Sequence, residues 1–208
     1  RNWYYFNWLC GDHITEQHIH NLDVSNWIKG GPPIRANAMG GREVRDDKET
    51  GEIFDHFFVE YEYADGSRMY SQCRHIKKCW NSVSEAVHGS KGMSDVNRSI
   101  IRPSEGNGDA WRFSGKRQAG HQQEWYDLFD SLDAGERPME AEYGATSTMT
   151  SILGRMAAYS GQVVNFDDAL KGGKSLAPER LAWDAAPQSK PGKDGHYPSP
   201  KPGMTKPF

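Results

Sequence analysis

Apolar side chains recur at helical spacing in several parts of the chain. Between residues 13 and 29 they fall at intervals that favour a helix. The run Gly30-Gly31-Pro32-Pro33 ends that helix. Residues 122–134 and 142–160 carry clearer apolar stripes, which predict two longer helices. A brief helix is predicted over residues 166–170.

Alternating polar and apolar positions predict strands after the first helix. Residues 53–63 alternate most clearly, and Asp65-Gly66 is typical of a hairpin turn. Residues 67–76 then return as the partner strand. One face of that strand is expected to carry Met69, Ser71, Cys73 and His75.

Other segments give weaker patterns. Residues 33–44, 83–89 and 92–101 are predicted as further strands, and 103–117 as a polar, glycine-rich connection. Residues 1–11 are rich in aromatic side chains, and we expect them to be extended. Either Asp12 or Thr15 is expected to cap the first helix.

The order of these elements predicts an α+β fold. One helix, four or five mainly antiparallel strands and then helices indicate an open, mainly antiparallel sheet with helices packed on one face. We expect this domain to span residues 1–186. Residues 187–208 are rich in Pro and Lys, which predicts an irregular tail, either wrapped along the surface or disordered.

Composition excludes several classes of protein. The chain has 208 residues, 36% of them hydrophobic and 12% aromatic, with a formal net charge of −3. Such a balance argues against a basic nucleic-acid binder and against an acidic disordered protein. No apolar run is long enough to span a membrane, and three cysteines without a CxxC pair argue against a disulfide framework or a thiolate zinc site.

The densest polar segment runs from Gly11 to Asp23. On a continuous helix Glu16, His20 and Asp23 would share one face, with His13 on the same side. A carboxylate one turn from an imidazole can orient it for acid–base chemistry near neutral pH. The alternatives are a solvated helix face and a metal site, and His18, which would point away from His20, disfavours the latter.

Two further segments offer candidate binding residues. Residues 2–5 are either a shelf for a sugar ring or part of a core strand, and Tyr4 is the residue we select from them. Arg74 lies between Cys73 and His75 on a predicted strand, where it either faces a cleft or flanks a buried cysteine. Neither a phosphate-binding glycine loop nor a GxSxG elbow is present.

Taken together, the motifs resemble the C-terminal half of the Gfo/Idh/MocA oxidoreductases. The family pattern of an acid, His four later, Asp seven later and Trp eleven later is met from Glu16 to Trp27, with Glu where most members have Asp. The resemblance continues over about residues 3–185. It includes the segments IFDHF (53–57), VHGSKG (87–92), GRMAAYSG (154–161) and FDDAL (166–170).

The resemblance implies roles for particular residues. His20 would exchange a proton with the hydroxyl being oxidised, Glu16 would orient the sugar or His20, and Asp23 would be structural. We expect His13, Tyr4 and Arg74 to bind substrate. The family's NAD or NADP is bound mainly by an N-terminal Rossmann domain, so we expect no cofactor-binding residues and no metal ligands in this chain.

The resemblance also implies partners and an activity. We expect the substrate-binding half of an NAD(P)-dependent enzyme that oxidises a secondary hydroxyl of a sugar or polyol, inactive without its Rossmann domain. The open sheet face is expected to mediate homo-oligomer contacts, with no nucleic acid or membrane as a partner. Alternatives are a stand-alone carbohydrate-binding or oligomerisation module, and a sugar lyase or glycosidase acting through a transient keto sugar or a metal. The abrupt aromatic start suggests a fragment of a longer, bacterial protein, cytoplasmic or exported to the periplasm.

Overall fold

A computed structural model describes residues 2–116 and 119–208 and divides the chain into two compact units. Unit 1 comprises residues 1–81 and 145–208, and unit 2 comprises residues 82–144. The elements of unit 1 are η1 (Trp3–Tyr5), α1 (Asn7–Cys10), α2 (His13–Glu16), α3 (Ile19–Lys29), β1 (Arg35–Gly41), β2 (His56–Glu62), β3 (Arg68–Arg74), most of α5 (Ala141–Ser160), β8 (Val164–Asn165) and α6 (Phe166–Gly172).

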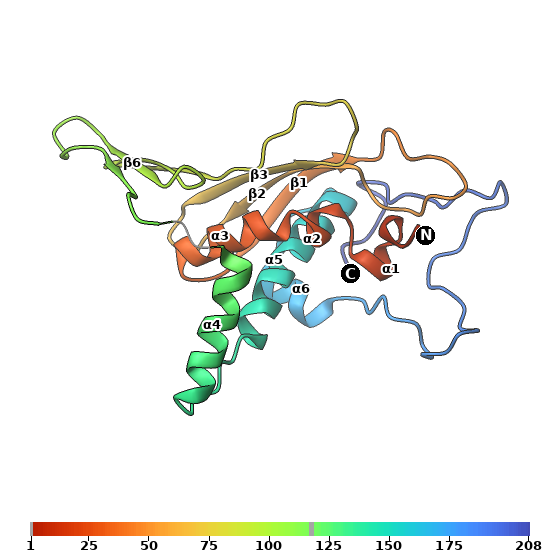
Figure 1. The fold of residues 1–208 in the computed structure, drawn as a ribbon. Coiled ribbons are helices and arrows are strands. Elements are labelled where there is room, and N and C mark those ends of the chain that lie inside the picture. The colour runs from red at the N-terminus through yellow and green to blue at the C-terminus, as the bar shows by residue number, and fades with distance from the viewer. Residues whose placement is uncertain (1, 117–118) are drawn as a thin grey trace. The chain divides into compact units, whose positions relative to one another are not determined.

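Unit 1 is a four-stranded sheet covered by helices on one face (Figure 1). The strand order is β3-β2-β1-β8, and every pair is antiparallel. The core forms where α2, α3, α5 and α6 meet the sheet; its largest fully buried side chains include Tyr61, Phe54, Ile14, Leu22 and Leu153. The predicted open antiparallel sheet with helices on one face is confirmed.

Strand alternation decides which side chains face the helices. In β2, Phe57, Val59 and Tyr61 are buried, whereas Phe58 between them is exposed. In β3 the alternation continues, with Ser71 buried toward the helices. The side chains predicted to share a face of this strand, at positions 69, 71 and 73, therefore do so.

The aromatic N-terminal segment was expected to be extended, and this expectation is wrong. It forms η1 and α1, and Gly11 ends α1 with a φ of 74°, a left-handed conformation that glycine adopts without strain. Asn2 Nδ2 donates to the Glu49 carbonyl at 2.8 Å, and the Asn7 backbone N–H donates to Glu52 Oε1 at 3.1 Å. These contacts with residues distant in the sequence stabilise two short helical segments where the aromatic composition favoured an extended chain.

The C-terminal tail is irregular and wraps along unit 1, one of the two forms expected for it. Gly203 N–H donates to the Ser160 carbonyl at 2.7 Å, and Ser199 Oγ donates to the Glu52 carbonyl at 3.0 Å. Tyr197 packs edge-on against Phe6, with ring centroids 5.0 Å apart. The tail thus helps to hold the N-terminal segment against the domain.

Unit 2 is a second, separate sheet with a helix, which the sequence did not predict as such. Its strands β4 (Ala86–Gly89), β5 (Gly92–Asp95), β6 (Ile100–Pro103) and β7 (Trp111–Arg112) form an antiparallel meander in chain order, followed by α4 (Gly120–Asp133). The strand expected over 92–101 is therefore two strands joined by a turn. Ile100 is the one buried hydrophobic residue among the described residues of this unit.

Candidate functional site

The start of α2 is held by a buried aspartate. Asp12 caps the helix, as expected for residue 12 or 15, and its carboxylate accepts hydrogen bonds from the backbone N–H groups of His13 at 2.5 Å and Phe54 at 3.1 Å. The Tyr159 hydroxyl donates to the same carboxylate. The backbone φ of Asp12 is 82°, which is strained for a residue with a side chain. The hydrogen bonds to its carboxylate therefore stabilise a conformation that the chain does not favour by itself.

The charge of Asp12 reflects two opposing causes. Burial raises the pKa of Asp12 to about 7, while the donors on Tyr159, Phe54 and His13 and the nearby Arg155 guanidinium favour the ionised form. Arg155 Nη1 donates to the Gly11 carbonyl at 2.8 Å, so α5 contacts the turn that leads into α2. The position of His13 is therefore determined by the segment that leads into β2 and by α5, as well as by its own helix.

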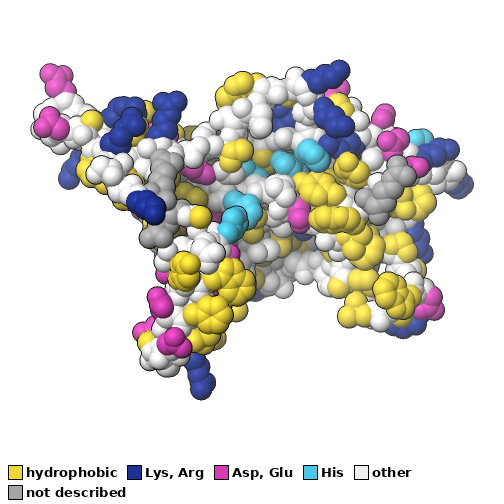
Figure 2. Space-filling view, viewed as in Figure 1, with side chains coloured by type: hydrophobic (Ala, Val, Ile, Leu, Met, Phe, Trp, Pro, Cys, Tyr) yellow, Lys and Arg dark blue, Asp and Glu magenta, His cyan; other side chains and the backbone are white. Residues whose placement is uncertain are grey.

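Three rings from distant parts of the chain meet at this helix start. The Tyr4 hydroxyl lies 2.8 Å from His13 Nδ1. The His75 ring stacks on His13, with centroids 5.2 Å apart and planes 21° apart, and lies edge-on to Tyr4 at 5.1 Å. Figure 2 shows histidine side chains at the surface over α2 and α3. Tyr4 and His13, both expected to bind substrate, are thus neighbours.

His75, not Arg74, completes this group of rings. Arg74 is exposed and pairs in register with His56, which pairs with Gly41, so its side chain lies on the open face of the sheet. Its Nη2 donates to the Trp80 carbonyl at 3.1 Å. The structure therefore does not bring Arg74 together with Tyr4 and His13. Period-two alternation through Cys73 already pointed to His75, which was not selected.

The helix predicted over residues 13–29 is broken after Glu16. Gln17 and His18 form a turn between α2 and α3, and His18 Nε2 lies 2.7 Å from Ser71 Oγ of β3. Burial lowers the pKa of His18 to about 4, so the imidazole is neutral at pH 7. The spacing predicted that Glu16 and His20 lie one turn apart on a continuous helix. Because the helix is interrupted, they do not.

The remaining candidates lie on both sides of this break. Glu16 is half-buried, and its negative charge contributes to raising the pKa of Tyr4, for which burial is the larger cause. His20 is exposed in the first turn of α3. Asp23 accepts a hydrogen bond from Ser147 Oγ of α5 at 2.5 Å, which fits the structural role expected for it.

The described residues show neither a metal site nor a dinucleotide site. Among residues 2–116 and 119–208, no three His, Cys, Asp or Glu side chains are arranged to hold a metal ion. In the same residues all strand pairs are antiparallel, whereas a dinucleotide fold needs a parallel βαβ unit with a glycine-rich turn. These residues therefore do not fit NAD(P) as its main binding site. No helix that is described is both long and apolar enough to cross a bilayer.

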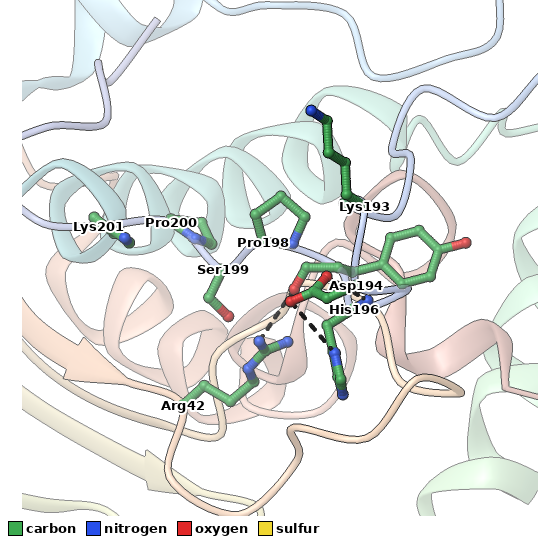
Figure 3. A pocket seen from close by; sticks show the side chains of 10 residues that line it. Arg42, Lys193, Asp194, His196, Pro198, Ser199, Pro200 and Lys201 are labelled. Carbon is green, nitrogen blue, oxygen red and sulfur yellow. Dashed lines mark hydrogen bonds and ion pairs between the residues drawn. The ribbon is translucent and has the colours of Figure 1, made fainter.

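A concavity lies between the tail and Arg42 (Figure 3). Arg42 Nη2 donates to the Tyr197 carbonyl at 3.1 Å, and Nη1 donates to the Gly51 carbonyl. Asp194 pairs with His196, whereas the Lys193 side chain extends away from Arg42 in this view. The guanidinium is engaged by the chain's own carbonyls, so we assign it to anchoring the tail.

Comparison with known proteins identifies the class of domain. A family model described as the C-terminal alpha/beta domain of an oxidoreductase family, Gfo/Idh/MocA, matches residues 1–179. The antiparallel sheet with helices on one face is the fold of that domain. The chain therefore belongs to the Gfo/Idh/MocA oxidoreductase family. The resemblance first inferred from the motif between Glu16 and Trp27 is confirmed.

Solved structures share the fold at low sequence identity. Aldose-aldose oxidoreductase from Caulobacter crescentus, complexed with glycerol, is 18% identical at a TM-score of 0.64, covering 79% of this chain and 51% of its own. Levoglucosan dehydrogenase, in complex with NADH and levoglucosan, is 12% identical at a TM-score of 0.62, and the match covers 79% of this chain and 53% of that protein. Myo-inositol 2-dehydrogenase from Lactobacillus plantarum is 17% identical at a TM-score of 0.52, and the match covers 73% of this chain and 48% of that protein.

The extent of these matches bounds what they establish. The chain spans about half the length of the solved structures it matches. A search of curated proteins gives no match to the sequence. The similarity therefore shows the fold and the oxidoreductase family, in which a nicotinamide cofactor and sugar substrates occur among the structural neighbours.

Proposed function

We propose that this chain is the substrate-binding half of an NAD(P)-dependent oxidoreductase that acts on a secondary hydroxyl of a sugar or polyol. The observation that carries the proposal is the group of Tyr4, His13 and His75 at the start of α2, together with the exposed His20 in the first turn of α3, in a domain of an oxidoreductase family. Hydroxyl and imidazole groups at a partly buried surface suit recognition of a polyhydroxylated ligand.

Each residue of this surface has a distinct task in the proposal. His20, exposed at the start of α3, exchanges the proton of the hydroxyl being oxidised, and Glu16 orients the sugar or that imidazole. Tyr4 and His13 bind other oxygens of the substrate. The nicotinamide, held mainly by an N-terminal Rossmann domain, would take the hydride. Arg74 has no part in this site because it lies on the opposite face of the sheet.

The open face of the sheet supports the proposal of a homo-oligomer. Met39 is 75% exposed there, and Phe58 and Tyr70 are 46% and 63% exposed with their rings stacked at 6.3 Å. Met39 pairs directly with Phe58 in the register of β1 and β2, so the three form one apolar surface. A second copy of the chain would cover it.

A panel assay tests the function. The protein joined to its N-terminal domain is incubated with NAD⁺ or NADP⁺ and a set of sugars and polyols, and the absorbance of the reduced nicotinamide is followed. We expect reduction with at least one of these compounds, and none with the 208-residue chain alone. Saturable sugar binding by the chain with no reduction would instead support a binding module. Elimination or hydrolysis products without net reduction would support a lyase or glycosidase.

A further inference from the structure

The contact between His13 and His75 is stacking, not hydrogen bonding. Their planes are 21° apart, and the His75 Nδ1 atom is buried without a hydrogen-bond partner among the described residues. The backbone of His75 is held on both sides: its N–H donates to the Asp55 carbonyl at 2.8 Å, and its carbonyl accepts from Arg45 Nη1. The ring therefore lies at a fixed place against His13.

The hydrogen bond between Tyr4 and His13 selects one form of the imidazole. Burial, followed by the nearby Cys10, Glu16 and Asp12 side chains, raises the pKa of Tyr4, so its hydroxyl keeps its proton. Within the described part of the chain His13 Nδ1 is the partner of that hydroxyl, at 2.8 Å. If the hydroxyl donates, Nδ1 accepts, and the ring proton of a neutral His13 is on Nε2.

The surroundings of His13 favour its neutral form. Burial lowers the pKa of His13 to about 4, and the nearby His75, His18 and Arg45 side chains act in the same direction. The charges that face it from its own helix and cap are the carboxylates of Glu16 and Asp12. The pKa of His75 is also lowered, chiefly by burial and then by the positive charges of Arg45 and Lys77, which outweigh the opposing effect of Asp55.

We propose that His75 is a positioning residue, which holds the His13 ring in the orientation where the Tyr4 hydroxyl fixes its Nε2–H tautomer, so that Nε2–H donates a hydrogen bond to an oxygen of the substrate. The ligand atom is an acceptor, a hydroxyl or carbonyl oxygen, because a neutral ring with Nδ1 engaged by Tyr4 has only a donor left to offer. The identity of that ligand rests on the proposed function, whereas the state of the His13 ring does not.

Nuclear magnetic resonance of the 208-residue chain tests the state of the ring directly. Long-range ¹H–¹⁵N spectra of ¹⁵N-labelled histidine distinguish the two neutral tautomers and give the pKa of each ring. We expect His13 as the Nε2–H tautomer and neutral at pH 6. Tyr4→Phe and His75→Ala should each produce a mixture of tautomers, whereas His75→Phe, which keeps a flat ring against His13, should keep the tautomer and raise the pKa of His13.

The control is His121→Phe, the same change at a fully exposed position of α4, which should leave the His13 signals unchanged. An Nδ1–H form of His13 in the unmodified chain would overturn the inference. So would spectra of His13 that Tyr4→Phe and His75→Ala both leave unaltered while the fold is intact by amide spectra.

Kinetics of the full-length enzyme test the consequence for binding. We expect His75→Ala to raise KM for the sugar by about tenfold or more with a smaller effect on kcat, and His75→Phe to restore most of the loss. An unchanged KM in His75→Ala would refute the role in binding while leaving the proposed function standing. If the enzyme oxidises no sugar or polyol, the proposed function fails, and the spectra still decide the positioning role.

Discussion

His13, His18 and His75 are at least half-buried, and burial lowers the pKa of all three, whereas His20, in the first turn of α3, is exposed. The sequence predicted a site in the segment from Gly11 to Asp23, and the alternation in β3 predicted that Met69, Ser71 and Cys73 share one face, as they do. We selected Arg74 and not His75, although alternation along the strand puts His75 on the same face as Ser71 and Arg74 on the other face. The neutral state of these rings depends on burial among distant elements, which spacing does not report.

Burial of these histidines predicts how stability depends on pH. For His13 and His18 the folded-state pKa is about 4 against an ordinary 6.5, so their contribution is fully present above pH 6.5 and is lost as pH falls toward 4. Asp12, raised to about 7, contributes in the opposite sense: its share is present below about pH 4 and is lost as pH rises through 7. The histidines outnumber it, so the free energy of unfolding should fall between pH 7 and 5.

Urea unfolding at the two pH values measures this effect. We expect a loss of about 1–3 kcal/mol on acidification, with His18→Gln showing a smaller loss because glutamine can still pair with Ser71 but does not titrate. His121→Gln, at an exposed site, should behave like the unmodified chain. An equal loss in His18→Gln and the unmodified chain would show that His18 is not the source.

At the scale of elements, local signals predicted most boundaries and long-range contacts decided the exceptions. The helix ending at Lys29 stops at Gly30, whose φ is 72°, and the hairpin at Asp65-Gly66 forms as predicted. The break at Gln17 and His18 was missed because apolar spacing continues through it, and the contact made there joins His18 to Ser71, 53 residues away in the chain. Similarly, α1 depends on contacts with Glu52 that no local pattern indicates.

Close packing of α5 on the sheet gives a prediction for one glycine. A Cβ atom at Gly154 would lie 2.1 Å from the Tyr61 hydroxyl oxygen and 3.1 Å from Ile14 Cδ1. Gly154→Ala should therefore lower the free energy of unfolding by about 1–3 kcal/mol, although alanine favours a helix.

Two variants control for that substitution in denaturant unfolding. Gly144→Ala lies in the same helix with no atom near the added Cβ, and should be neutral or stabilising by up to about 1 kcal/mol. Tyr61→Phe removes a hydroxyl that has no hydrogen-bond partner among the described residues, and should rescue part of the loss. If Gly154→Ala and Gly144→Ala are equally stable, the close approach of α5 to Tyr61 is wrong.

For the whole molecule, the sequence predicted the fold class but not the division into two units. The short strands of residues 82–115 read as further members of one sheet, because the pattern of a strand does not name its partner. The assignment of residues 1–186 to a substrate-binding and oligomerisation domain stays a prediction.

The two units should differ in local stability. Unit 1 holds the buried core, whereas among the described residues of unit 2 only Ile100 is a buried hydrophobic side chain. Since protection from exchange follows buried contacts, amide hydrogen exchange should be slow in β1, β2 and α5 and fast in β4–β7 and α4. Equal protection in both units, measured on the same chain, would contradict this distribution of the core.

The most direct measurement is the turnover of the full-length enzyme with His20→Ala. Because His20 is the group assigned to the substrate's proton, kcat should fall by about 10²–10⁴-fold. His88→Ala, at an exposed position of β4, should leave kcat unchanged. Turnover of His20→Ala equal to that of the unmodified enzyme, on any sugar or polyol that it oxidises, would contradict the assignment of this surface as the active site.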